Sequence, residues 1–322
     1  MNRRYTLEVR QQMAWPWQAL ILTVSLILGL LISGAILVWA GVPAGELLNE
    51  FVFLTLFDAQ SLKAVLFQAS PLIMVGLAGC LAFRAKFWNL GLEGQMIFGA
   101  IGATAITMWE IGSPAMRLPL MIIAAMVCGL LWSVAPVLLR LKLQVNEIVS
   151  TLMLNYIAIN FLLHLMYGAW KDPKDAFPYS PKYESFELLP DLANGLSLSI
   201  PIAIGTALLV LWFVGISRGG LYLRFVDKSP QVARAVGVPV ARTILLAVLF
   251  SGALAGLAGL MVAAGQEGRL THSFYVGYGF SGILIAFLAR NNPIAATCAA
   301  LLIATLFCLL YTSDAADDLL CV

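Results

Sequence analysis

Charged residues are scarce in this 322-residue chain. Asp, Glu, Lys and Arg together make up 11% of it, whereas 61% is hydrophobic and the mean hydropathy is +0.91. Soluble domains usually carry about 25% charged residues, so this composition excludes a soluble globular fold. The net charge of +2, with no basic run, also gives no basis for a nucleic-acid partner. The composition predicts an all-α protein whose helices lie in membrane lipid.

The residues of metal, disulfide and nucleotide sites are missing or scattered. Of the five cysteines, Cys80, Cys128 and Cys298 fall singly in apolar segments, and the two histidines have no metal-ligand spacing. This pattern fits neither a disulfide framework nor a zinc site. No Gly-x-x-x-x-Gly-Lys-Ser/Thr phosphate loop occurs either. We therefore expect no metal, no cofactor and no ATP hydrolysis by this chain itself.

One motif allows an enzymatic interpretation. The segment Gly279-Phe280-Ser281-Gly282 matches the Gly-x-Ser-Gly of intramembrane serine proteases. That chemistry needs a general base, and in those proteases a His follows the Ser on a later helix. No His follows Ser281. The sequence therefore predicts that the protein is not an enzyme.

Hydrophobic runs long enough to cross a bilayer recur along the chain. A bilayer core needs about 20 apolar residues per helix, and the clear runs are Ala19–Ala40, Ala64–Phe83, Leu118–Leu139, Ile148–Gly168, Leu198–Ile216 and Thr243–Ala264. Shorter or interrupted runs are Gly91–Trp109, Gly279–Ala289 and a last one from Pro293. The segment Glu46–Asp58 has the character of an interfacial or bent helix. The sequence predicts a polytopic membrane protein with about eight or nine transmembrane or half-spanning helices.

The distribution of cations predicts the orientation. With residues 1–18 in the cytoplasm and residues 19–307 threaded alternately as the transmembrane domain, 12 of the 19 Lys and Arg fall inside: Arg3, Arg4, Arg10, Arg84, Lys86, Arg140, Lys142, Arg218, Arg224, Lys228, Arg234 and Arg242. The outer loops instead hold most of the acids. Cytoplasmic loops carry an excess of Lys and Arg. We therefore expect a multi-pass protein of the bacterial plasma (inner) membrane with a cytoplasmic N-terminus.

Two loops are long enough to have structure of their own. The outer loop spans residues 169–197 and mixes both charge signs with several prolines and aromatics, and the inner loop spans residues 218–242. In the inner loop, Ser229 can cap a helix whose first residue is Pro230, and Gly237 and Pro239 end it after about two turns. Such a short helix needs a partner to pack against.

Internal symmetry is suggested by a repeated tetrapeptide. Gly76-Leu77-Ala78-Gly79 recurs as Gly256-Leu257-Ala258-Gly259, and each copy is followed by a short helix that opens with Gly-x-x-Gly. The predicted threading runs the two copies in opposite directions. Inverted repeats with interrupted helices are typical of transporters. Chance recurrence, or small residues used only for helix packing, explains the pattern equally well.

Polar residues within or beside apolar runs are candidates for the substrate pathway, because such groups usually face a cavity or a partner. They are Asn89, Glu93, Gln95, Asn155, Ser281, Asn291 and Asn292. Glu93 lies in the first turn of its run, where it can instead cap backbone amides and favour the helix dipole. Asn155 and Asn160 can bond across helices. The Arg290-Asn291-Asn292-Pro293 break is either a tight turn or a pathway lining.

The C-terminal segment departs from the membrane pattern. The last apolar run is cut short by Tyr311-Thr312-Ser313-Asp314, followed by more acids. The run Cys308–Asp317 resembles a transposase sequencing adapter read in one frame. We therefore expect residues 308–322 to be a non-native tail, and the natural protein to continue with at least one more helix.

Several longer segments together resemble one transporter family. From about Gln68 to Thr305 the chain is similar to the permease subunits of nucleoside and simple-sugar ABC importers, within the branched-chain amino acid/ribose permease superfamily. The segments that carry the resemblance are Ala69–Ile73, Phe83–Gln95, Asn146–Tyr156, Ala233–Val238 and Ala289–Pro293.

The resemblance implies a set of partners and a coupling site. It implies a separate cytoplasmic ABC ATPase subunit, a second related permease subunit and an extracytoplasmic substrate-binding lipoprotein. The helix from Pro230 would be the coupling helix that docks on the ATPase, with Arg224, Pro230, Ala233, Arg234, Ala235, Val236 and Gly237 as candidate contacts. The main alternative, an ion-coupled secondary transporter, needs mid-span carboxylates, and the six clear runs contain none. Nucleoside, base, sugar and amino acid substrates all stay open.

Overall fold

The computed structural model describes residues 15–41, 43, 45, 58–192, 195–274 and 277–318. The N-terminal cations Arg3, Arg4 and Arg10 lie outside these residues, as does the expected interfacial segment Glu46–Asp58 apart from its last residue. The chain divides into two compact units, residues 1–62 and 63–322. Each unit is described by itself.

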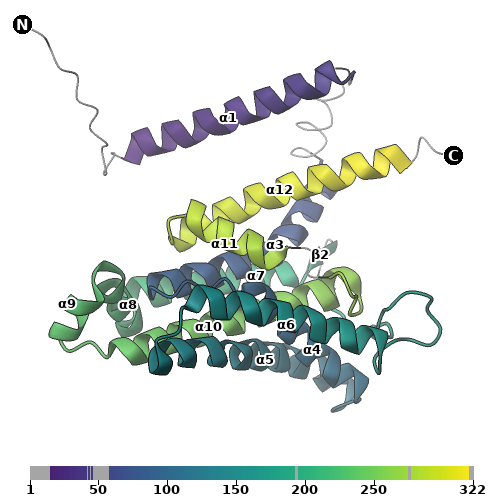
Figure 1. Cartoon of the computed structure of the whole chain (residues 1–322). Helices are drawn as coiled ribbons and strands as arrows, with labels where there is room; N and C mark the ends of the chain where they lie inside the picture. The colour runs from purple at the N-terminus through teal and green to yellow at the C-terminus, as the bar shows by residue number, and fades with distance from the viewer. Residues whose placement is uncertain are drawn as a thin grey trace, which may run out of the picture. The chain divides into compact units, whose positions relative to one another are not determined.

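The described part of the first unit is dominated by one apolar helix. Helix α1 runs from Trp15 to Trp39 and covers the first predicted span, Ala19–Ala40, except for its last residue (Figure 1). Large aliphatic side chains are exposed on several sides of it, among them Leu28, Leu31 and Ile36. A helix that is apolar all round suits a membrane and not a water-facing surface.

The second unit is built almost entirely of helices (Figure 1). They are α3 (Ala59–Arg84), α4 (Leu92–Met108), α5 (Pro114–Leu143), α6 (Glu147–Tyr167), α7 (Ser199–Ile216), α8 (Arg218–Lys228), α9 (Pro230–Ala235), α10 (Val240–Leu260), α11 (Tyr278–Leu288) and α12 (Pro293–Asp318). The two-residue strands β1 (Asp191–Leu192) and β2 (Leu196–Ser197) pair antiparallel. Every apolar run predicted from the sequence is a helix, so the all-α class is confirmed.

Length and composition separate the helices into two groups. Within the described residues, α3, α5, α6, α7 and α10 with its continuation to Glu267 are long and apolar enough to cross a membrane. Shorter apolar stretches are Thr23–Trp39, Tyr278–Leu288 and Pro293–Cys308. The fold is therefore a polytopic membrane protein that combines full spans with shorter helices, as predicted.

Helices α3 and α10 form the centre of the second unit. Their most apolar windows are 78% and 72% buried inside the protein, against about a third or less for α5, α6 and α7. Helix α10 packs against both α4 and α5. The peripheral helices therefore present much of their apolar surface outward, where lipid or other subunits can cover it.

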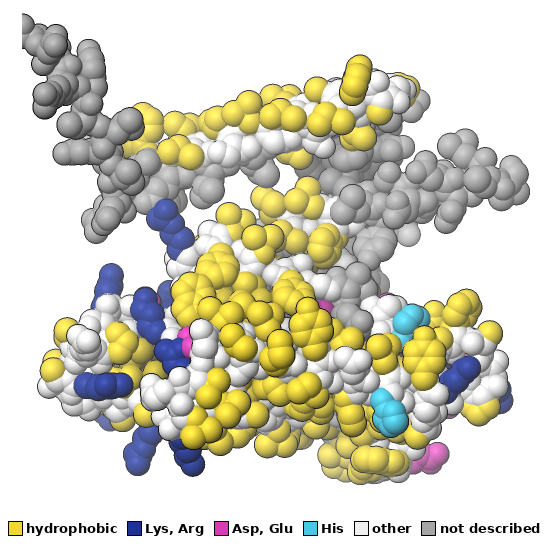
Figure 2. Space-filling model, viewed as in Figure 1, with side chains coloured by type: hydrophobic (Ala, Val, Ile, Leu, Met, Phe, Trp, Pro, Cys, Tyr) yellow, Lys and Arg dark blue, Asp and Glu magenta, His cyan; other side chains and the backbone are white. Residues whose placement is uncertain are grey.

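The two ends of the second unit differ in charge. Lys and Arg side chains gather at the end that carries α8 and α9 (Figure 2). At this end Lys86, after α3, lies 3.2 Å from Asp227 on α8, and Arg140 on α5 pairs with Glu147 on α6. The loop that follows α6 lies at the opposite end (Figure 1). The gathering of cations agrees with the predicted basic inner end, although the orientation itself stays a prediction.

Helix α12 continues through the segment with the predicted adapter-like sequence. Its backbone is helical from Pro293 to Asp318. The backbone has no break at Cys308, and the origin of residues 308–322 stays a prediction.

Candidate functional site

The N-terminus of α4 is held by a side chain from another helix. Its N-cap residue is Gly91, which has no side chain to offer the first amides. Asn155 on α6 supplies the missing group: its Oδ1 accepts a hydrogen bond from the Gly94 amide (2.9 Å), and its Nδ2 donates to the Leu90 carbonyl (2.7 Å). Asn155 is 2% exposed. The sequence-based expectation that Asn155 bonds across helices is therefore confirmed.

The N-terminus of α11 is capped in the same way by Glu93 on α4. The Glu93 carboxylate accepts hydrogen bonds from the backbone amides of Gly277 (3.2 Å), Gly279 (2.7 Å) and Phe280 (3.2 Å). Gly277 is the N-cap of α11 and has a φ of +76°. A negative group at a helix N-terminus satisfies open amides and complements the dipole. The capping role expected of Glu93 is thus real, but the helix that it caps is α11, not its own.

Glycine at position 279 allows the carboxylate to come this close. A Cβ on Gly279 would lie 2.5 Å from both the Cα and the Oε2 of Glu93. The second Gly-x-x-Gly motif therefore places a residue without a side chain in the first turn of α11, at the point where α4 packs against it.

A second buried cluster joins the turn before α4 to α10. The Asn89 and Gln95 side-chain amides are paired, with Nδ2 to Oε1 at 3.1 Å and Nε2 to Oδ1 at 3.2 Å. Asn89 also accepts from the Gly91 amide (3.1 Å) and donates to Ser251 Oγ on α10 (3.4 Å). Buried amides need such partners because an unpaired polar group costs about 1–3 kcal/mol. The predicted pathway residues Asn89, Glu93, Gln95 and Asn155 are thus all buried around the start of α4, in three separate hydrogen-bonded groups, and their contact with substrate stays a prediction.

The two copies of the repeated tetrapeptide pack reciprocally. Gly76 and Gly79 on α3 face α11, where their added Cβ atoms would lie 2.6 Å from Ile285 Cγ2 and 2.9 Å from Ala286 Cβ. Gly259 on α10 faces the Met96 carbonyl of α4. Each copy therefore contacts the short helix that follows the other copy. This arrangement favours the predicted symmetry over chance recurrence.

The remaining pathway candidates lie around α11. Ser281 is half-buried on its first turn. Asn291 has a φ of +60°, and its carbonyl accepts a hydrogen bond from Arg84 Nε at 2.7 Å. Asn292 is exposed, and its Oδ1 accepts from the Ile294 amide (3.0 Å) at the start of α12. Of the two interpretations of the break between α11 and α12, the geometry supports the tight turn.

The predicted inner loop contains two short capped helices. Ser217 caps α8 by accepting from the Gly220 amide (3.0 Å), and Ser229 caps α9 by accepting from the Val232 amide (3.4 Å). Helix α9 starts at Pro230, as predicted, and Gly237 follows it with a φ of +82°. The preceding helix α8 was not predicted.

One of the candidate coupling residues, Ala233, does not lie on the surface of α9. Ala233 is fully buried in a small cluster with Val226, Val238 and Val240. It is therefore a packing residue within this chain, and the expectation that it contacts an ATPase directly is wrong. The other candidates are exposed or half-buried: Arg224, Pro230, Arg234, Ala235, Val236 and Gly237.

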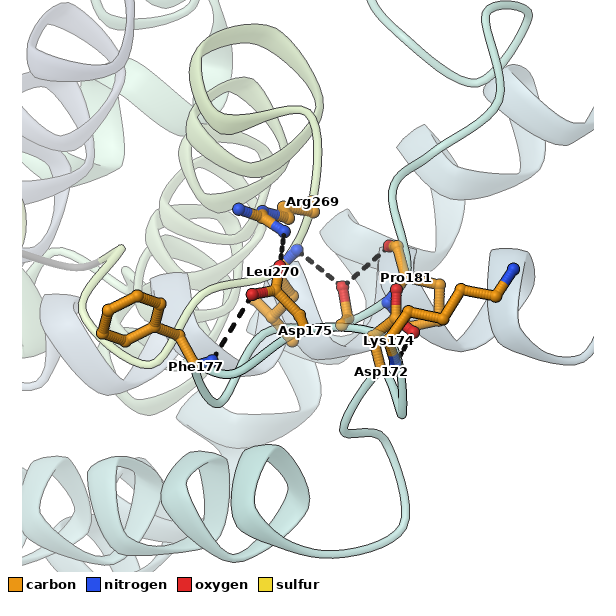
Figure 3. A network of polar contacts seen from close by, with 8 residues as sticks. Asp172, Lys174, Asp175, Phe177, Pro181, Arg269 and Leu270 are labelled. Atoms are coloured by element: carbon orange, nitrogen blue, oxygen red, sulfur yellow. Dashed lines mark hydrogen bonds and ion pairs between the residues drawn. The ribbon is translucent and has the colours of Figure 1, made fainter.

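The outer loop folds onto the segment that links α10 to α11. Asp175 forms an ion pair with Arg269 at 2.6 Å (Figure 3), and the Arg269 guanidinium lies 4.1 Å from the ring centroid of Tyr179. Ser180 pairs with Leu270 through its amide (3.0 Å) and its Oγ (2.9 Å). The loop is therefore attached to the chain just before the helix that Glu93 caps.

A closed ring of hydrogen bonds connects α3, the end of α10 and α11. Gln68 Nε2 donates to Tyr278 Oη (2.6 Å), Tyr278 Oη donates to Gln266 Oε1 (2.9 Å), and Gln266 Nε2 donates to Gln68 Oε1 (3.2 Å). Gln266 lies in a π-helical turn, Met261–Glu267, that extends α10. Such turns occur frequently at functional sites.

Comparison with known proteins assigns this arrangement to a family. Residues 61–315 match the family model described as the permease component of branched-chain amino acid transport systems. The chain belongs to this permease family.

Several named relatives align with most of the length of this permease. It is 34% identical to the glucose ABC transporter permease protein TsgB13 of Haloferax volcanii, over 95% of this chain and 84% of that protein. It is 31% identical to the guanosine ABC transporter permease protein NupP of Bacillus subtilis (73% and 69% covered), and 27% identical to the nucleoside ABC transporter permease protein NupB of Lactococcus lactis (90% and 83% covered). The chain is thus a permease subunit of an ABC importer, and the alternative of an ion-coupled secondary transporter is set aside.

The ring of Gln68, Gln266 and Tyr278 in this permease was not predicted from the sequence. Gln68 lies within an apolar run and Gln266 lies just beyond one, and polar residues within or beside apolar runs were the signal that selected the pathway candidates. The contact could not be predicted, because 198 residues separate the two glutamines in the sequence.

The ion pair in the outer loop of the permease leads to a prediction. The hydrogen bond from Arg269 lowers the pKa of Asp175 below its ordinary value of 3.8. The pair therefore holds the loop at pH values above 3.8 and is lost as the pH falls further. We expect Asp175→Asn to speed trypsin cleavage after the loop lysines a few-fold at neutral pH, because Arg269 loses its charged partner. Asp191→Asn, at an exposed position of the same loop, is the control, and equal cleavage of the two variants would contradict the prediction.

Proposed function

We propose that this permease forms, with a second related permease subunit, the membrane pathway for nucleosides or simple sugars. A separate cytoplasmic ABC ATPase binds at α9 and drives the transport, and an extracytoplasmic substrate-binding lipoprotein delivers the solute to the end that carries the outer loop. The protein lies in the bacterial plasma membrane with its N-terminus in the cytoplasm, residues 19–307 form the transmembrane domain, and residues 308–322 are a non-native tail.

The observation that supports binding of an ATPase is the exposed surface of α9. Val232 and Val236 are 57% and 59% exposed on this capped helix, beside the exposed Arg234. Apolar side chains beside a cation, at the basic end of the unit, suit a groove on a soluble partner. Ala233 fixes the helix from below through its buried cluster. The helix therefore has both a rigid base and an apolar outer surface.

The choice of substrate class rests on chemistry and on the relatives. The buried polar side chains around the start of α4 are three amides and one carboxylate, and the carboxylate oxygens accept hydrogen bonds from backbone amides. Such groups suit neutral solutes with hydroxyl or nucleobase edges better than anions or amines. The named relatives transport glucose, guanosine and nucleosides, according to their names.

Placing a charge on the exposed face of α9 tests the coupling role. In the complete importer we expect Val236→Asp to reduce substrate uptake about tenfold, because a carboxylate buried without a partner in an interface costs more than about 1.4 kcal/mol. The level of folded permease in the membrane should be unchanged, because Val236 is 59% exposed on its own chain. Uptake of labelled nucleoside or glucose and the level of the permease are the measurements.

Two further variants make the result specific. Leu192→Asp places the same charge on a residue that is 45% exposed at the opposite end, in β1, and should leave co-purification of the ATPase with the permease unchanged. Ala233→Asp should instead lower the level of folded protein, since it puts a charge into the buried cluster. Normal uptake by Val236→Asp, at normal permease levels, would overturn the assignment of α9.

A further inference from the structure

Helix α6 exposes polar side chains on the face that it turns away from its own unit. It packs against α4 and α5, using Thr151, Asn155, Ala158, Leu162 and Met166 as buried residues. On the other face, Tyr156 and Tyr167 are 62% and 66% exposed, and Asn160 and His164 are exposed as well. Residues spaced by three and four lie on one side of a helix. The four side chains therefore form a polar stripe, defined here as Tyr156, Asn160, His164 and Tyr167.

The polar stripe reaches the middle of the membrane. Helix α6 has 21 residues, or about 31 Å at 1.5 Å per residue, close to the bilayer core of about 30 Å. Tyr156 lies about 14 Å from the first residue of α6 and about 16 Å from the last. Asn160 lies about 6 Å further toward the outer loop. Tyr167 and His164 suit an interface by their position near the helix end, but Tyr156 and Asn160 do not.

A polar group at this depth is costly if it faces lipid. Polar side chains inside membranes almost always face a protein interior or a water-filled cavity. The Asn160 amide donates to the Tyr156 carbonyl of its own helix (2.8 Å). That bond satisfies one hydrogen of the amide. Asn160 is exposed, and among the described residues no donor is bonded to its Oδ1. Lipid cannot satisfy that oxygen.

The stripe occupies only one half of the helix face. On the same face, toward the basic end, the exposed residues are Val149 and Met153, which are 54% and 55% exposed. The face is therefore apolar from the start of α6 to its middle and polar from there to the outer loop. A face that contacted lipid along its whole length would have no reason for this change.

We propose that the polar stripe of α6 lines a water-filled vestibule for the transported solute. The vestibule opens at the end with the outer loop and ends near the membrane centre, where Met153 begins the apolar half. A second permease subunit forms the opposite wall. The solute is a neutral polar molecule, since the Asn160 amide both donates and accepts hydrogen bonds and the Tyr156 ring offers a face for a sugar or a base to stack on. This inference rests on the proposed function for the identity of the solute.

Cysteine accessibility tests the vestibule in the assembled importer. Only a thiolate reacts with methanethiosulfonates, and burial in an apolar medium raises the thiol pKa, so a cysteine facing water reacts faster than one facing lipid. We expect Tyr156→Cys and Asn160→Cys to react with a charged, membrane-impermeant methanethiosulfonate about tenfold or more faster than two controls. The controls are Ile123→Cys on α5 and Leu208→Cys on α7, which are 57% and 62% exposed. Both lie about 14 Å into their helices, measured from the end that carries the outer loop.

The controls and the native background define the outcomes. The parent chain, with its five native cysteines, gives the rate to subtract. Met153→Cys, one turn deeper on the same face, should react as slowly as the controls. Reaction of Asn160→Cys at the control rate would overturn the vestibule and assign this face to lipid or to a dry subunit contact.

A leucine substitution separates the vestibule from a lipid-facing surface by an independent measurement. If Asn160 faced lipid, Asn160→Leu would be neutral or stabilising, whereas in a vestibule it removes a polar contact of the solute. We expect Asn160→Leu to lower uptake severalfold at an unchanged level of complex, and Asn160→Gln to retain more uptake. Normal uptake by Asn160→Leu would overturn the proposal. Fast labelling in an importer that transports neither nucleosides nor sugars would leave the vestibule intact and overturn the proposed substrate class instead.

Discussion

Replacing Glu93 with Ala should lower the free energy of unfolding of the permease by about 2–5 kcal/mol, because three backbone amides lose their acceptor at once. The amides of Gly277, Gly279 and Phe280 are the open N–H groups of α11. Glu93 is 1% exposed, so water cannot easily replace it. Loss of an ordinary exposed N-cap costs about 1 kcal/mol, and the larger figure here reflects burial and the number of amides.

Thermal unfolding of the purified complex in detergent, together with ATP-driven uptake, measures this effect. Glu93→Gln should fall between Glu93→Ala and the parent, since it keeps one acceptor oxygen and turns an amide NH₂ toward N–H groups. Glu110→Gln is the matched control. The Glu110 side chain is 80% exposed, and its ion pair with Arg117, at 3.5 Å, is open to solvent on the Glu110 side. Exposed pairs of this kind contribute about 0–1 kcal/mol. Parent-like unfolding of Glu93→Ala would show that α11 does not depend on its cap from α4.

The sequence predicted those features that depend on neighbouring residues. Apolar run length located every described helix of the membrane domain except α8 and α9, and the Ser229-Pro230 pair located the start of α9. Both signals are local, because span length is set by the bilayer and an N-cap acts within three residues.

Features that depend on distant residues were only partly predictable. The sequence indicated that Glu93 would cap amides, but the amides belong to a helix that starts 185 residues later in the chain, at Tyr278. Burial of Ala233 by Val226 and Val238 likewise depends on α8 folding back onto α9, which no periodicity indicated. The pairing of Gln68 with Gln266 and Tyr278 could be predicted only if the packing of α3 against the end of α10 and against α11 were already known.

The borrowed caps explain how the short helices are held in the membrane domain. Helices α4 and α11 both begin after a glycine N-cap, and each takes its cap from a neighbouring helix, α4 from α6 and α11 from α4. Unsatisfied amides are especially costly in lipid, so each borrowed cap both stabilises a short helix and fixes its position. The positions of α6, α4 and α11 are therefore linked through two side chains, Asn155 and Glu93.

The first glycine of the second tetrapeptide, Gly256, lies at a close crossing of α10 and α5. A Cβ on Gly256 would overlap the carbonyl oxygen of Ala125 on α5 and lie 3.1 Å from the Cα of Gly129. Facing it, a Cβ on Gly129 would lie 2.7 Å from the Cα of Gly256. The obstructing atoms belong to the backbone, which cannot move aside as the end of a side chain can. Small residues at such positions allow membrane helices to approach closely.

Gly256→Ala should therefore destabilise the permease by about 3 kcal/mol, since overpacking in a dense interior forces the helices apart. The matched control is Gly205→Ala on α7, where an added Cβ meets nothing within 4 Å. That substitution should leave stability unchanged or raise it by about 0.5–1 kcal/mol, because alanine favours a helix over glycine. Unfolding temperature and the yield of assembled complex distinguish the two variants. If Gly256→Ala and Gly205→Ala behaved alike, the tight crossing of α5 and α10 would not contribute to stability, and the repeated glycines would need another explanation.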